Sequence, residues 1–314
     1  MSTDLFVPEA SASAEDHADC FEFAALKNGR YSIQDFGRGI RRSGTAEDLG
    51  DPEAAGYRGD IGGEKSETVA EDAFGAIEDR LRACGEEAYP FEVKPNYLTR
   101  RETGGHWVYI FLLLLSKFGK DAGPRGANGA KLFEEVCGAA AQSYFGGPDE
   151  QFALVGKKIF GFPRKEGTGF KKAVDSLCRE MGEGDGIRPR SKLSDYKDDK
   201  LDIVVWRNFL DKRPGKLVGF GQCATGGNWE SKKTELQPLD FCHFWMKDSS
   251  TISPVKMFFV PHRVERNDWK NICSFSGILF DRCRITYHAQ GLDQALMKSC
   301  IKWSRHVLNG EVTG

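Results

Sequence analysis

The residues best suited to chemistry are two polar side chains in otherwise apolar segments. Asp202 lies in residues 201–206, whose β-branched and aromatic residues predict a strand, and Gln222 lies near the end of a second predicted strand, residues 217–223. Carboxylate and amide oxygens are ligands that Mg²⁺ accepts in proteins. A cation held by them polarises a phosphate and activates a water molecule, which is the chemistry of phosphodiester hydrolysis.

A hairpin is needed to bring Asp202 and Gln222 together. The turn residues Arg-Pro-Gly-Lys at 213–216 separate the two strands, and side chains at matched depth on neighbouring strands converge. A helix precedes the first strand; its apolar residues share one face and end before a glycine (Phe170, Val174, Leu177, Met181, Gly182). The elements that follow are a helix at residues 229–245, strands at 255–260 and 277–280, and a closing helix at 292–308. This order predicts the α/β class, with a mixed sheet flanked by helices.

The first half of the chain has the pattern of a mainly helical module. The spacing of apolar residues predicts helices at residues 71–84, 106–118 and 131–144. Residues 43–68 are rich in glycine and acidic residues, which predicts a mobile loop. The sequence Phe-Gly-Gly-Pro-Asp-Glu-Gln after the last helix indicates a boundary. We therefore expect a mainly helical, acidic N-terminal module at residues 1–150 and a second domain at residues 151–314.

Charge is distributed unevenly along the chain. Residues 1–154 hold 16 Lys and Arg against 27 Asp and Glu, a net charge of −11, whereas residues 155–314 hold 28 against 19, a net charge of +9. A DNA-binding module joined to an acidic partner module would show this asymmetry. Two halves of one protein that attract each other would show it equally, so the charge pattern leaves both readings open.

The second half resembles a known nuclease family. A helix ending at Gly182, then Asp-Asp-Lys-Leu-Asp-Ile-Val-Val-Trp at residues 198–206, then a strand ending in a polar triplet resemble the PD-(D/E)xK nuclease superfamily, above all its Mrr-type restriction enzymes. The resemblance covers about residues 168–262 and implies a restriction-endonuclease-like fold. The segment Gly-Phe-Gly-Gln-Cys-Ala-Thr-Gly-Gly-Asn-Trp at residues 219–229 also resembles endonuclease-like proteins encoded among bacterial anti-phage defence genes.

The family's metal-binding residues match this sequence in part. By the resemblance, Asp202 is the metal-binding aspartate, and Gln222 is the glutamine that replaces the family's second acid as a ligand or water-orienting group. The family lysine falls at position 224, which is Ala224 here. Lys232 or Lys233, about two turns into the following helix, would supply the missing positive charge.

The family's helical acid is also displaced. Its matching position is Lys171, so Asp175, one turn further on the same helix face, or Glu183, just beyond the helix, would substitute as a metal ligand. Glu183 would then also act in catalysis.

The resemblance implies a metal-dependent endonuclease that hydrolyses DNA phosphodiester bonds with Mg²⁺ or Mn²⁺. It would act in the cytoplasm in bacterial anti-phage defence, gated by a protein partner such as a helicase or sensor subunit. The alternative is a catalytically inactive nuclease-fold subunit that binds DNA or scaffolds a defence complex, because the lysine and the helical acid are absent from their family positions.

Each candidate residue also has a purely structural interpretation. Asp202 would form an ion pair with Lys200 or Arg207, and Gln222 would bond to the backbone at a strand end. Lys232 and Lys233 would be solvated residues at a helix start. A basic run (Arg188, Arg190, Lys192, Lys197) and His262 would contact phosphate or belong to solvated loops and turns, while Asn228 would cap a helix and Trp229 would join the core.

Several other classes of protein find no support in the sequence. It holds no GxxxxGK[ST], no strand-linked GxGxxG, no GxSxG and no HExxH motif. Its nine cysteines include no CxxC pair, which favours free thiols over disulfides or a zinc site. The N-terminus is acidic where a signal peptide would be basic and apolar. The longest apolar stretch, residues 107–115, is far shorter than the ~20 residues of a membrane span, so no membrane association is expected.

Overall fold

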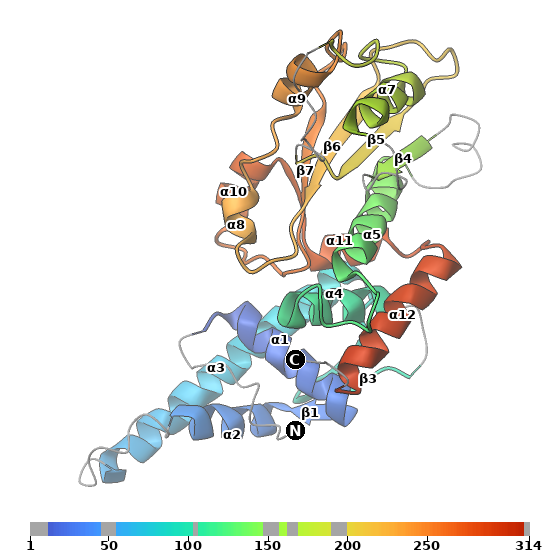
Figure 1. Cartoon of the computed structure of the whole chain (residues 1–314). Coiled ribbons are helices and arrows are strands. Elements are labelled where there is room, and N and C mark those ends of the chain that lie inside the picture. Colours follow the sequence, from blue (N-terminus) through green and yellow to red (C-terminus); the bar gives the residue numbers. More distant parts are fainter. Residues whose placement is uncertain are drawn as a thin grey trace. The chain divides into compact units, whose positions relative to one another are not determined.

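The computed structural model describes residues 12–44, 55–102, 106–146, 157–161, 169–189 and 200–310. The chain forms two compact units, Met1–Leu113 and Leu114–Gly314, each of which combines helices with a sheet (Figure 1). The fold is therefore mixed α/β, as the sequence predicts. Among the described helices, none combines the length and the apolar character that crossing a membrane requires.

The first unit surrounds a small antiparallel sheet with long helices. Its elements are α1 (Ala14–Asn28), β1 (Arg30–Ser32), α2 (Ile33–Gly44), α3 (Ala55–Cys84), β2 (Phe91–Lys94) and β3 (Tyr97–Arg100), and its strand order is β1-β3-β2. The sequence did not predict this sheet. The predicted loop at residues 43–68 is corrected in part, because α3 begins at Ala55. Extending a helix costs less than starting one, so the strong pattern of residues 71–84 continues back through the glycine-rich segment.

A buried charge network lies at the centre of the first unit. The guanidinium of Arg80 is fully buried and binds the carboxylates of Glu15, Asp19 and Glu22 at 2.6, 2.7 and 2.8 Å. Glu22 is equally buried, and the Tyr89 hydroxyl donates to its carboxylate at 2.5 Å. Burial, followed by the charge of Glu22, raises the pKa of Tyr89 well above its usual value. Buried charges require such complete pairing, so Arg80 joins α3 to α1.

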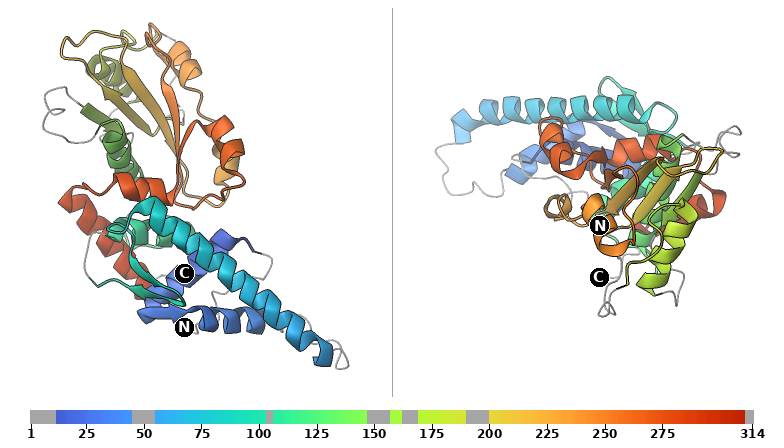
Figure 2. Two further views of the ribbon diagram at one scale, coloured as in Figure 1. Left: turned by 180° about the vertical axis from the view of Figure 1, so that it is seen from behind. Right: turned by 90° about the horizontal axis from the view of Figure 1, so that it is seen from above.

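The second unit is built on a five-stranded mixed sheet with the strand order β4-β5-β6-β7-β8. Its strands are β4 (Lys157–Gly161), β5 (Ile203–Arg207), β6 (Leu217–Cys223), β7 (Val255–Phe259) and β8 (Ile278–Phe280). Its helices are α5 (Gly129–Tyr144), α7 (Phe170–Met181), α8 (Trp229–Lys232), α9 (Pro238–Trp245), α10 (Trp269–Ser276), α11 (Arg282–His288) and α12 (Gln294–Leu308). Strands β4, β5 and β6 are antiparallel neighbours, and β6, β7 and β8 are parallel (Figure 2).

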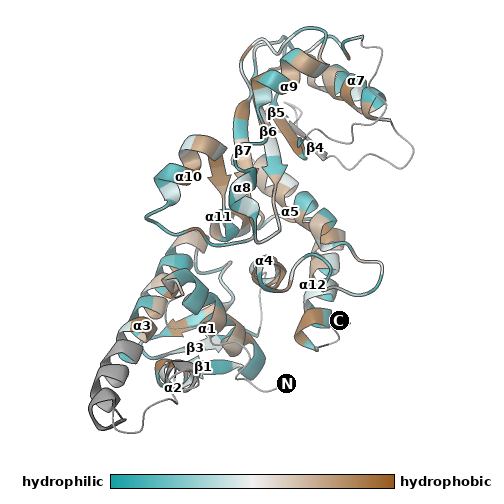
Figure 3. Cartoon of the chain, turned by 60° about the vertical axis from the view of Figure 1, so that its left-hand side comes forward, coloured by the Kyte–Doolittle hydropathy of each residue, from teal (hydrophilic) through white to brown (hydrophobic). Residues whose placement is uncertain are grey.

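Helices cover both faces of this sheet. One face of β5 and β6 buries Val204, Trp206, Val218 and Phe220 in a single core with α7 and α9. The opposite face meets α5, since a Cβ at Gly219 would stand 2.6 Å from the ring of Phe145 at the end of that helix. In the hydropathy view, α7 and α12 alternate hydrophilic and hydrophobic residues, as helices that cover a core do (Figure 3).

Two predicted boundaries differ from the structure. The compact units separate at Leu113, within α4 (Trp107–Phe118), rather than after residue 150, because α5 packs on the large sheet. The single helix expected at residues 229–245 is two short helices, since Pro238 starts α9 and lacks the N–H that a continuous helix needs. The predicted stop of α7 is confirmed: Gly182 has a left-handed backbone (φ 71°) that glycine adopts readily.

Candidate functional site

Asp202 and Gln222 lie at the same end of the β5–β6 hairpin. The last residue pair of this ladder is Ile203 with Gly221, so Asp202 and Gln222 are the next residues on each strand. The Asp202 backbone N–H donates to the carbonyl of Gly221 at 3.0 Å. Its side-chain Oδ2 accepts the backbone N–H of Cys223 at 2.7 Å, a position that a backbone carbonyl usually takes in a sheet. The carboxylate is therefore held rigidly against the end of β6.

Among the described residues, the Gln222 side chain has a hydrogen-bond partner at its amide nitrogen and none at its amide oxygen. It is only 4% exposed, and its Nε2 donates to Glu235 Oε2 at 2.9 Å. Glu235 in turn pairs with Lys200 at 3.3 Å. Because an ionised carboxylate can only accept, this contact fixes which end of the amide carries the oxygen. Within the described part of the chain, no donor reaches the buried Oε1. Burying an acceptor of this kind costs free energy unless a hydrogen-bond donor or a cation binds it.

Helix α5 brings a further acid towards Asp202. The Cys137 thiol on α5 and the Cys223 thiol on β6 lie close enough to shift each other's pKa. Burial raises the pKa of Cys223 well above its usual value, and the Cys137 contact and the negative charges of Asp202 and Glu134 add to this shift. Glu134 is half-buried on the same helix as Cys137. The structure thus brings two carboxylates near one pair of thiols.

Three residues of this cluster were not candidates from the sequence. Glu134 belongs to a helix that sequence reasoning assigned to the other module, so nothing local connected it to Asp202. Lys200 entered only as an ion-pair partner for Asp202, and the structure pairs its ammonium with Glu235. Glu235 lies between α8 and α9, in a segment that was expected to be continuous helix. No local signal distinguished these residues from other surface charges.

Neither predicted lysine is engaged with the Asp202 and Gln222 pair. The Lys233 ammonium lies 5.6 Å from the ring centroid of Phe275, and its carbonyl accepts the Lys256 ammonium at 2.9 Å. Lys232 ends α8, and its half-buried side chain makes no ion pair among the described residues. The lysine found in the cluster is Lys200.

The predicted helical acids lie at the other end of β6. Glu183 Oε1 accepts the backbone N–H of Gly215 at 2.9 Å, just before β6 begins, and its Oε2 accepts that of Thr251 at 2.8 Å. Six residues of extended chain separate Lys216 from Gln222, about 20 Å. Asp175 accepts the backbone N–H of Ile187 at 2.7 Å. The structure therefore uses both acids to hold loops and does not bring either to Asp202.

Glu183 provides a direct test of this structural assignment. Glu183→Ala is expected to lower the free energy of unfolding by about 3 kcal/mol, because backbone N–H groups of three residues lose their acceptor at about 1 kcal/mol each. Denaturant unfolding of the full chain measures this, with the exposed Glu180→Ala on α7 as the control. A Glu183→Ala protein as stable as wild type would contradict the assignment.

The remaining predicted contacts are mostly structural. The imidazole of His262 stacks on Trp229, with ring centroids 6.1 Å apart and an interplanar angle of 23°. The guanidinium of Arg188 donates to the carbonyl of Met246 at 3.1 Å. Asn228 precedes α8 without a capping side-chain bond. Arg190, Lys192 and Lys197, the other members of the predicted basic run, lie outside the described residues.

Comparison with known proteins does not assign this chain to a family. The chain matches no family model, no curated protein and no solved structure. In the described part of the chain, no group of three or more His, Cys, Asp or Glu side chains is placed to hold a metal ion. The chemistry must therefore be judged from Asp202, the Gln222 amide oxygen and their neighbours.

Proposed function

We propose that the second unit binds DNA and hydrolyses its phosphodiester bonds with a water molecule activated by Mg²⁺ or Mn²⁺. The observation that carries this proposal is the buried Gln222 Oε1, which lacks a donor within the described residues and lies one residue pair beyond the β5–β6 ladder, beside Asp202. Residues directly opposite on antiparallel strands have their Cβ atoms about 5 Å apart. An anionic oxygen and an amide oxygen at that spacing suit one hard cation.

The chemistry of these donors fits Mg²⁺. This ion is usually bound through one or two carboxylates, with water and substrate phosphate completing its shell. Asp202 would provide the carboxylate, Gln222 Oε1 a neutral oxygen, and Glu134 additional negative charge. When bound, the cation would polarise the phosphate and lower the pKa of the attacking water. Because the site needs only two protein oxygens, the lack of a three-acid cluster among the described residues is compatible with it.

The surrounding residues would orient the reacting groups. Glu235 holds Gln222 Nε2, so Oε1 is turned away from that contact. We assign to Lys200, in place of Lys232 or Lys233, the stabilisation of charge on the phosphate, because its ammonium binds Glu235 beside Gln222 and its side chain is 53% exposed. The neighbouring acid-bearing and glutamine-bearing strands support a restriction-endonuclease-like core. The resemblance of residues 219–229 supports a role in bacterial anti-phage defence, with gating by a helicase or sensor partner.

A second candidate is a DNA-binding subunit without catalysis. Ala224 replaces the lysine expected on the strand, and Lys232 and Lys233 make no ion pair with Asp202. An inactive descendant of a nuclease would retain the fold and lose these groups. Cleavage by the purified chain separates the two candidates.

The test is plasmid cleavage by the full chain in Mg²⁺, in Mn²⁺ and in EDTA. We expect cleavage only with the metals. Gln222→Met, which keeps the side-chain length but removes both polar atoms, is expected to lower the rate about 10- to 100-fold, the range for lost groups that tune a metal site. Gln237→Met is the matched control, because Gln237 is exposed and its side chain, within the described ranges, bonds to the Thr234 carbonyl alone. Metal-independent cleavage, or equal rates in wild type and Gln222→Met, would contradict the proposal.

A further inference from the structure

Helix α12 (Gln294–Leu308) has an unusually one-sided charge. It carries Lys298, Lys302, Arg305 and His306, and no acidic residue lies between Asp293 and Glu311. Lys298, Lys302 and Arg305 are spaced by four and three residues, so they start from one stripe of the helix. All three are exposed, while Cys300, Trp303 and Val307 on the other side are buried.

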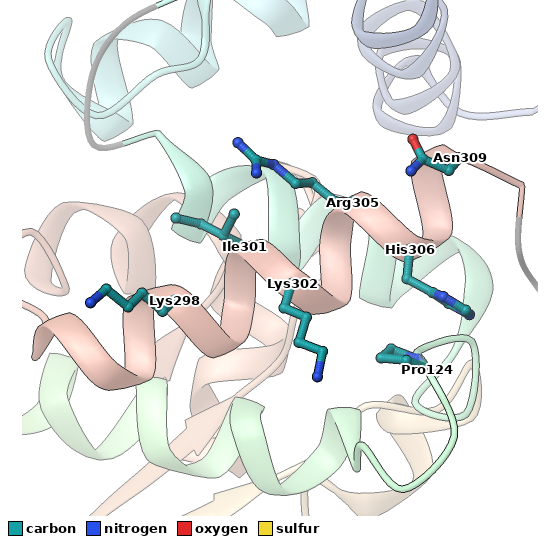
Figure 4. A pocket seen from close by; sticks show the side chains of 7 residues that line it. All are labelled: Pro124, Lys298, Ile301, Lys302, Arg305, His306 and Asn309. Atoms are coloured by element: carbon teal, nitrogen blue, oxygen red, sulfur yellow. The ribbon is translucent and has the colours of Figure 1, made fainter.

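This stripe borders a groove with a volume of about 640 Å³. Pro124, Ile301, His306 and Asn309 complete its lining (Figure 4). Figure 4 shows Lys302 and His306 extending towards Pro124 and Arg305 extending away from it. The wall is tightly packed, because a Cβ at Gly123 would stand 2.0 Å from the Trp303 indole nitrogen. The backbone that carries these positive side chains is therefore held in place by tight packing.

Interaction with the helix dipole explains only some of the positive charges on α12. Arg305 and His306 lie in the last turn of α12, where basic residues interact favourably with the helix dipole. Lys298 and Lys302 lie too far from that end to benefit, since the effect is confined to the last turn. Neither lysine pairs with a carboxylate among the described residues. An exposed helix usually mixes both signs of charge for solubility and pairing, so this stripe fits an anionic partner.

The length of the stripe suits a polyanion with closely spaced charges. A helix rises about 1.5 Å per residue, so Lys298 to Arg305 spans roughly 10 Å. Each strand of duplex DNA presents about one negative charge per 3.4 Å of axis, so a row of this length meets about three phosphates. An acidic polypeptide of similar charge spacing would carry its charges on flexible side chains, and ordering those side chains costs free energy. The geometry therefore favours a nucleic-acid backbone.

Helix α5 connects this stripe to the candidate site. Burial raises the pKa of Cys300 on α12 to about 12, and the Glu135 carboxylate on α5 adds to the shift. The next residue along α5, Glu134, acts on Cys223 beside Asp202. Helix α5 therefore lies between the buried side of α12 and the sheet that carries Asp202.

We propose that the α12 stripe of Lys298, Lys302 and Arg305 binds the phosphate backbone of double-stranded DNA. The identity of the ligand as DNA rests on the function proposed above. The contacts are to phosphates, so the stripe adds affinity without selecting sequence.

The test is binding of a labelled duplex by the full chain in EDTA, over a series of salt concentrations. The variant combines Lys298→Gln, Lys302→Gln and Arg305→Gln. The matched control combines Lys171→Gln, Lys172→Gln and Arg179→Gln, three equally exposed charges on α7. The α12 variant is expected to reduce the slope of log affinity against log salt by about 2.7, since each phosphate contact contributes about 0.9. Near 0.1 M salt this is a loss of affinity of about 100-fold or more.

Three results would overturn the proposal: wild-type binding by the α12 variant, an equal loss in the α7 control, or binding of polyglutamate but not of the duplex by the wild-type chain. Cleavage in Mg²⁺ is scored separately. A wild-type chain that binds DNA through α12 but never cleaves it contradicts the proposed hydrolysis and leaves the stripe assignment in place. If the wild-type chain cleaves DNA and the α12 variant binds the duplex as wild type does, the stripe assignment is contradicted and the proposed hydrolysis is left in place.

Discussion

Asp202→Asn is expected to reduce metal-dependent DNA cleavage by about 10³-fold or more, the range seen when a group that stabilises charge in phosphoryl transfer is removed. The asparagine oxygen can still accept the Cys223 N–H that Oδ2 accepts now. The hairpin should therefore keep its structure while the site loses its principal negative charge. Initial rates of plasmid cleavage in Mg²⁺ and in Mn²⁺ measure the effect.

Asp211→Asn is the matched control for this substitution. Asp211 is exposed in the loop between β5 and β6, where its side chain accepts the backbone N–H of Arg213. The control should cleave at the wild-type rate. Equal rates in wild type and Asp202→Asn would remove Asp202 from the site and with it the proposed metal chemistry.

Arg80→Met is expected to lower the free energy of unfolding by about 3–5 kcal/mol, the usual result of removing one partner from a buried ion pair. Glu22 would remain fully buried without the Arg80 guanidinium, although Tyr89 and Tyr109 would still donate to it. Denaturant unfolding of the full chain measures the change. The transition affected should be that of the first unit, since Arg80 and the carboxylates that it binds lie there.

Arg82→Met is the control for the loss of an arginine from α3. Arg82 is 68% exposed and, among the residues that the structure describes, pairs with Asp79 alone, three residues away. Such exposed pairs contribute little, so the change should stay within about 0.5 kcal/mol. Adding Glu22→Gln to Arg80→Met should recover part of the lost stability, because a neutral amide is less costly to bury than an unpaired carboxylate. Equal stability of Arg80→Met and Arg82→Met would show that the network contributes nothing.

Elements with a strong local pattern were predicted well from the sequence. Strand β6 has the predicted bounds, β5 and β7 differ by one or two residues, and α7 ends before Gly182 as expected. In each case the signal lies within a few residues: β-branched runs for strands, apolar spacing for helices, and glycine for a left-handed end. Weak patterns failed, as in the glycine-rich start of α3 and the proline that divides α8 from α9.

The sequence by itself determined that Asp202 lies at the start of one strand and Gln222 near the end of the next, because a polar residue in an apolar run is visible without a structure. Only the tertiary structure decided which side chains surround them. It brought Glu134 from a helix expected in the other module, linked Lys200 to Gln222 through Glu235, and placed Glu183 at the far end of β6. Helix and strand formation depends on near neighbours in sequence, whereas these contacts depend on how helices pack on the sheet. No local pattern encodes that packing, since an apolar stripe specifies that a helix is buried but not against which strands.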